Sequence, residues 1–115
     1  MIGLVRPLSD DLDCKKQQNA INRKYSLMIL KSDQSYSEGK DDVLSISNIV
    51  SSIADNEELV ITSLKVLGDS REEILQNLIM MNVKNIQLIS MEEQIVLGGT
   101  TLEEFLKPIL KQNLI

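Results

Sequence analysis

The sequence contains no histidine, no tryptophan and only one cysteine among its 115 residues. Without histidine, zinc sites built on imidazole and histidine-based acid–base catalysis are excluded. The single cysteine, Cys14, excludes a disulfide within the chain and is typical of a reducing compartment. We therefore expect a cytoplasmic protein that carries no cofactor.

Long apolar runs and basic clusters are also missing. No apolar run is long enough to span a bilayer, and Asp10, Asp11 and Asp13 interrupt the N-terminus too early for a signal peptide. The 12 Lys and Arg residues are scattered, and 17 Asp and Glu residues bring the formal net charge to −5. Because nucleic-acid-binding domains usually carry a basic face, we expect DNA to be bound only weakly or through a partner.

Hydrophobic residues make up 43% of the chain and charged residues 25%, which is typical of one soluble globular domain spanning 1–115. Apolar runs alternate with segments of helical periodicity, and this order predicts a three-layer α/β fold with a mostly parallel sheet. The predicted strands lie at 2–5, 25–31, 58–64 and 85–90, and the predicted helices follow 7–11, span 41–54, and begin after Ser70 and after Thr101.

Capping residues support three of these helices. Ser70 and Glu73 form a capping box, Thr101 and Glu104 a second one, and Asp41 or Asp42 is placed to cap the helix over 41–54. Pro108 lies inside the last helix, so we expect this helix to bend or to start again there.

The first strand ends at Arg6, and a turn with Ser9, Asp10 and Asp11 leads into a polar helix. In a parallel sheet, ligands and chemistry gather at such a carboxyl end. The positions that carry a family resemblance here are Gly3, Arg6, Asp10, Asp11, Gln17, Ala20 and Ile21. In this order they resemble the N-terminal catalytic domain of serine recombinases, the resolvase/invertase family.

A second stretch agrees with the first. Residues 64–69, LKVLGD, precede the helix at Ser70 and are similar to the Leu-Asp-Arg-Leu-Gly-Arg segment that follows the third strand in that family. The resemblance covers roughly residues 2 to 95. It implies a resolvase-like domain of Rossmann/flavodoxin-like topology and a role in site-specific DNA recombination.

The departures from the family pattern concern the groups that cleave DNA. The family's serine nucleophile corresponds to Leu8, and positions that hold arginines in the family correspond to Val43, Val66 and Asp69, while Lys65 replaces an aspartate. Arginines stabilise the charge that develops during phosphoryl transfer, and Asp69 would instead repel a phosphate. We therefore expect a catalytically inactive domain that acts through protein association.

Two residues near the expected site allow different interpretations. Arg6 either holds an anion or pairs with Asp10, Asp11 or Asp33, and the acidic composition favours pairing. Ser9 could replace the missing nucleophile, which would make the chain an active recombinase fragment. A cap on the following helix is the favoured role for Ser9, and capping is also favoured over metal binding for the Asp10–Asp11 pair.

A regulatory alternative concerns Ser70. The order strand, Gly68-Asp69-Ser70, helix is similar to the phosphoacceptor segment of STAS domains, the anti-sigma-factor antagonists, although Arg71 and Glu72 stand where those domains usually have a glycine. An ordinary helix cap is the favoured interpretation.

The last helix carries an apolar stripe, and the sequence shows no helix-turn-helix domain after it. We expect the stripe to cover the chain's own core or, as the alternative, to form a dimer interface with a second copy or a related recombinase subunit. Its residues are Leu102, Phe105, Leu106, Ile109 and Leu110.

Overall fold

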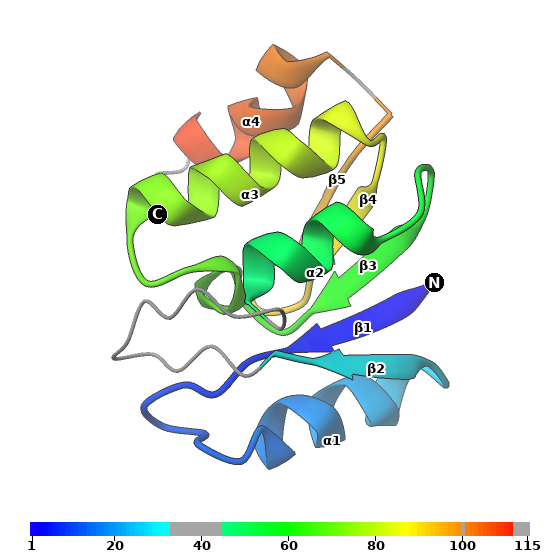
Figure 1. Ribbon diagram of the computed structural model, residues 1–115, viewed down its shortest axis with the longest axis vertical. Helices are drawn as coiled ribbons and strands as arrows, with labels where there is room; N and C mark the ends of the chain where they lie inside the picture. Colours follow the sequence, from blue (N-terminus) through cyan, green and yellow to red (C-terminus); the bar gives the residue numbers. More distant parts are fainter. Residues whose placement is uncertain (33–44, 100, 112–115) are drawn as a thin grey trace.

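Five strands form one sheet in the order β2-β1-β3-β4-β5, and helices lie on both of its faces (Figure 1). The computed structural model describes residues 1–32, 45–99 and 101–111. The strands are β1 (Ile2–Val5), β2 (Met28–Lys31), β3 (Glu58–Ile61), β4 (Gln87–Ser90) and β5 (Ile95–Leu97). The helices are α1 (Lys15–Lys24), α2 (Ile46–Ser52), α3 (Arg71–Val83) and α4 (Leu102–Lys111), with a 3-10 helix η1 (Leu64–Leu67) after β3.

The sheet is mostly parallel, as the sequence predicted. β1 pairs in parallel with both β2 and β3, and β3 pairs in parallel with β4. The chain moves from β1 to one side of the sheet and then crosses to β3 on the other side. The strand order therefore reverses between β1 and β3, which is where ligands bind in open α/β sheets.

β5 was not predicted from the sequence. It pairs antiparallel with β4 through a tight turn at 91–94, and it ends at Leu97, just before Gly98 and Gly99. Three residues are too few to show the alternation of apolar and polar residues that identifies a strand, and the turn contains no glycine. Gly98 and Gly99 lie between β5 and α4.

The two faces of the sheet are covered unequally. Figure 1 shows α1 on one face, and α2 and α3 on the other face with α4 beside α3. The larger core lies under α2, α3 and α4 and includes Leu4, Leu59 and Leu88 from the strands. The smaller core lies under α1 and consists of Val5, Cys14, Ile21 and Val60. Neighbouring strand residues alternate between these cores, as the pleat requires.

Side-chain caps set several of the element boundaries. The Ser70 hydroxyl accepts a hydrogen bond from the Glu73 amide at 3.1 Å, which confirms the predicted start of α3. The Ser63 hydroxyl accepts from the Lys65 amide at 3.2 Å and begins η1, so the predicted strand over 58–64 ends at Ile61. Ser45 caps α2 through the Asn48 amide, whereas Asp41 and Asp42 lie outside the described residues.

α4 runs from Leu102 to Lys111 without starting again at Pro108. Its first turn is capped as predicted, because the Thr101 hydroxyl accepts from the Glu104 amide at 3.3 Å. Phe105 and Ile109 are 1% and 0% exposed and belong to the larger core. Within the described part of the chain, no helix combines the length and apolar character needed to cross a membrane.

Candidate functional site

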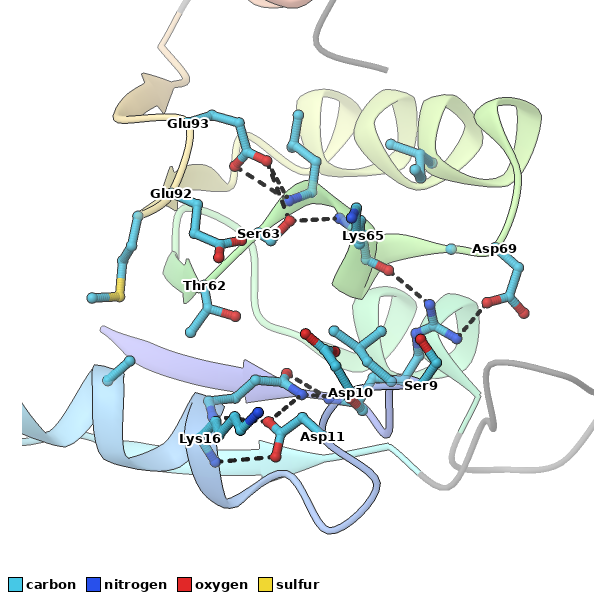
Figure 2. Close-up of a pocket in the computed structure, with 18 of the residues that line it drawn as sticks. Ser9, Asp10, Asp11, Lys16, Thr62, Ser63, Lys65, Asp69, Glu92 and Glu93 are labelled. Carbon is cyan, nitrogen blue, oxygen red and sulfur yellow. Dashed lines mark hydrogen bonds and ion pairs between the residues drawn. The ribbon is translucent and has the colours of Figure 1, made fainter.

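A pocket of about 980 Å³ opens at the carboxyl ends of β1, β3 and β4, where the strand order reverses (Figure 2). Residues that directly follow these strands line it, together with the start of α1 and the segment that leads into α3. Arg6 follows β1, Thr62 and Ser63 follow β3, and Glu92 and Glu93 follow β4. The sequence predicted this end of the sheet as the site because Arg6 ends the first strand.

The Arg6 side chain is 1% exposed, and all three of its guanidinium nitrogens are bound within the chain. Nε donates to the Val66 carbonyl at 3.1 Å, and Nη2 donates to the Lys65 carbonyl at 2.7 Å. Nη1 forms an ion pair with the Asp69 carboxylate at 2.9 Å. Arg6 therefore binds two carbonyls at the end of η1, of which the Lys65 carbonyl also accepts from the Gly68 amide at 3.4 Å.

The partner of Arg6 differs from the predicted ones. Pairing with a carboxylate was the favoured expectation, but the partner is Asp69 rather than Asp10 or Asp11, and Asp33 lies outside the described residues. A buried guanidinium needs a fixed counter-charge, and the 3-10 turn after β3 brings Asp69 to it. The two sequence stretches that resemble the recombinase family thus meet at one ion pair.

Asp11 and Gln17 fix the start of α1 against the end of β1. The Gln17 side chain accepts from the Arg6 amide at 3.1 Å and donates to the Arg6 carbonyl at 2.7 Å. Asp11 accepts from the amides of Lys16 and Gln17 and from the Gln17 side chain, at 3.0–3.1 Å. Burial alone would raise the pKa of Asp11, but the Gln17 and Lys16 amides outweigh it and lower the pKa from 3.8.

Residues 8–11 form a tight turn closed by two backbone hydrogen bonds between Leu8 and Asp11. Leu8 lines the pocket and packs against the larger core, while Ser9 and Asp10 are exposed at the tip. The favoured prediction that Ser9 caps the helix is wrong, because Asp11 binds the first amides of α1 instead. Ser9 and Arg6 line the same pocket.

Both signs of charge surround the pocket. Lys16, Lys65 and Arg71 are exposed cations, and Asp10 and Glu92 are exposed anions. Figure 2 shows Thr62, Ser63 and Glu92 on one side of the pocket and Ser9 and Asp10 on another. Across the residues that the structure describes, no group of three or more Cys, Asp or Glu side chains is placed to hold a metal ion.

The role of Glu93 was not predicted from the sequence. Its carboxylate accepts from the Ser63 hydroxyl at 3.2 Å, from the Leu64 amide at 3.3 Å and from the Ser90 hydroxyl. It thereby caps η1 from the turn after β4. Capping by a residue 29 positions along the chain leaves no local pattern that could have revealed it.

Two other sets of predicted residues have structural roles. The Ser70 hydroxyl is the cap of α3, as the favoured interpretation expected. Of the α4 stripe, Phe105 and Ile109 are buried and Leu106 packs against the larger core, while Leu102 and Leu110 remain 38% and 49% exposed.

No protein-family model matches the chain, and no curated protein matches it either.

Proposed function

We propose that this chain is a relative of the serine-recombinase catalytic domain that has lost DNA cleavage and acts in site-specific recombination through protein association. The observation that carries the proposal is that each of the three Arg6 guanidinium nitrogens is bound to a group of the chain itself. The proposal includes a resolvase-like topology of Rossmann/flavodoxin type, which the reversal of strand order between β1 and β3 supports.

Direct contact between the two family-like stretches supports the descent. Arg6 belongs to the first stretch, and its three partners are Lys65, Val66 and Asp69 of the second. A domain that once held a phosphate between these stretches would bring the same positions together. Here the guanidinium is hydrogen-bonded to a carboxylate and two carbonyl oxygens instead of a phosphate.

Loss of cleavage follows from the groups that remain. Leu8 has no nucleophilic atom and packs against the core. A phosphate approaching Arg6 would have to displace the Asp69 carboxylate, and like charges at close range repel. Phosphoryl transfer depends on positioned cations that stabilise developing charge, and the one buried cation among the described residues of this site, Arg6, is already bound to Asp69 and two carbonyls.

The association surface that we propose is the exposed part of α4, namely Leu102 and Leu110 with Leu106 beside them. Its partner would be a second copy of the chain or a related recombinase subunit. The proposal places the protein in the cytoplasm, with DNA bound only weakly or through that partner, in keeping with the net charge of −5.

Cleavage can be tested with supercoiled plasmid and with end-labelled duplex DNA. We expect the purified protein to leave the plasmid intact and to form no covalent link that survives denaturation. A covalent adduct formed by the wild-type protein would overturn the loss of cleavage.

A second candidate, an active recombinase fragment using Ser9, is favoured by one observation: Ser9 is exposed and lines the same pocket as Arg6. It predicts an adduct that Ser9→Ala abolishes. Ser70→Ala is the matched control because Ser70 is another exposed pocket serine. An adduct lost only in Ser9→Ala would establish this second candidate.

Self-association can be tested by sedimentation equilibrium over a wide concentration range. We expect a concentration-dependent dimer that the double change Leu102→Ser and Leu110→Ser weakens at least tenfold. Val83→Ser is the control, because Val83 is 79% exposed on a different helix. A monomer at every concentration would exclude a second copy as the partner, and equal effects of both variants would exclude α4 as the surface.

A further inference from the structure

Asp69 lies on the solvent side of the Arg6 guanidinium. The Arg6 side chain is 1% exposed, whereas the Asp69 side chain is 32% exposed and lines the pocket. Nε and Nη2 of Arg6 are held by backbone carbonyls at the end of η1, which cannot move away without unwinding that turn. Nη1 is held only by a side chain, so this nitrogen is the one that a ligand in the pocket could take over.

The Asp69 carboxylate has no other anchor in the described part of the chain, where its single contact, a hydrogen bond that is also an ion pair, is with Nη1 of Arg6. We propose that Asp69 is an autoinhibitory anion. Its carboxylate occupies Nη1 of Arg6 and thereby keeps small inorganic oxyanions, such as phosphate, out of the pocket. This inference rests on the proposed function in one respect, because both take Arg6 as the group to which an anion would bind.

With Asp69 neutral, the pocket lining carries as many cationic as anionic side chains, so the buried Arg6 guanidinium is the group that would attract an anion. A buried guanidinium that loses its carboxylate keeps an uncompensated charge, and charge-assisted hydrogen bonds to an oxyanion are the strongest replacement. Lys65 and Arg71 line the same pocket and add to the attraction. Four carboxylates oppose it: Asp10 and Glu92 are exposed and therefore better screened, whereas Asp11 and Glu93 are held by the first amides of α1 and η1.

The test compares Asp69→Ala with Asp10→Ala, because each change removes one negative charge from the same pocket and only the first frees Arg6. Thermal unfolding is measured in potassium phosphate and in potassium chloride at equal ionic strength. Phosphate stabilises most proteins without binding at a site, so the wild-type protein supplies the baseline. For Asp69→Ala we expect a saturable rise in Tm of about 5 °C beyond that baseline, and for Asp10→Ala none.

Asp69→Asn serves if Asp69→Ala fails to fold, since the amide keeps the shape of the side chain and removes its charge. A phosphate response of Asp69→Ala or Asp69→Asn no larger than that of the wild-type protein or of Asp10→Ala would overturn the inference. The readout is anion binding rather than DNA cleavage or self-association, so its failure is distinguishable from failure of the proposed function.

Discussion

The Gln17 side chain bonds both backbone groups of Arg6, accepting from its amide at 3.1 Å and donating to its carbonyl at 2.7 Å. The Gln17 side-chain amide thus makes the two backbone hydrogen bonds that a neighbouring strand would make just beyond the end of β1. Gln17 is in turn bound to Asp11, so one continuous network joins the start of α1 to Arg6 and, through it, to the end of η1.

Gln17→Leu should lower the free energy of unfolding by about 2 kcal/mol or more, because it leaves a buried amide and a buried carbonyl of Arg6 without partners. Urea unfolding measures the change. Gln18→Leu is the control, since this neighbour is half-buried and makes no side-chain hydrogen bond within the described residues. An equal loss in both variants would show that the network does not stabilise the fold.

Asp11 should make stability depend on acidity. Its folded-state pKa is lowered from 3.8, so the stability it contributes is complete above that value and is lost as the pH falls below it. Asp11→Asn should therefore unfold more easily at pH 7, by about 1–2 kcal/mol, and should show a smaller loss of stability between pH 4 and pH 2. Urea unfolding across this range provides the measurement, with Asp10→Asn as the exposed control. Parallel pH profiles for the wild-type protein and Asp11→Asn would contradict the assignment.

Cys14 should react slowly in the folded protein. Its thiol is 0% exposed, and burial raises its pKa, so both access and the thiolate fraction are reduced. We expect labelling by a thiol-specific disulfide reagent at pH 8 to be at least about 100-fold slower in native buffer than in concentrated urea. Comparable rates in the two solutions would mean that the start of α1 opens readily.

The α4 stripe should divide into core and surface residues. Phe105→Ala should destabilise the fold by roughly 3–5 kcal/mol because Phe105 fills part of the larger core. Leu110→Ala should cost less than about 1 kcal/mol because Leu110 is 49% exposed. Thermal unfolding of the two variants at low concentration separates these effects from association, and similar losses would show that the whole stripe is core.

Local patterns predicted much of the fold. The Ser70–Glu73 capping box predicted the start of α3. The apolar runs between segments of helical periodicity predicted the parallel strands. The error at Arg6 arose because a distant segment supplies its partner, whereas the error at Ser9 arose from the geometry of a local turn. The partner of Arg6 lies 63 residues away, so the local aspartates at 10 and 11 were the wrong expectation. Ser9 was expected to cap α1, but the turn at 8–11 points Asp11 at the helix instead.

A pocket lies at the end of the sheet where the sequence predicted a site, but the hydrogen bonds around the pocket were not predicted. Sequence reasoning can place Arg6 at the end of a strand because a strand ends where its apolar run stops. It cannot place the Glu93 carboxylate on η1, because that contact depends on how the turn after β4 meets the end of β3.

β5 leaves the sheet with an edge that is difficult to extend. It is three residues long, and a Cβ at the Gly98 that follows would lie 2.9 Å from the Gln87 backbone. An incoming chain would find few free amides there and a bend immediately after them. Fibril-like growth from the β5 edge is therefore disfavoured.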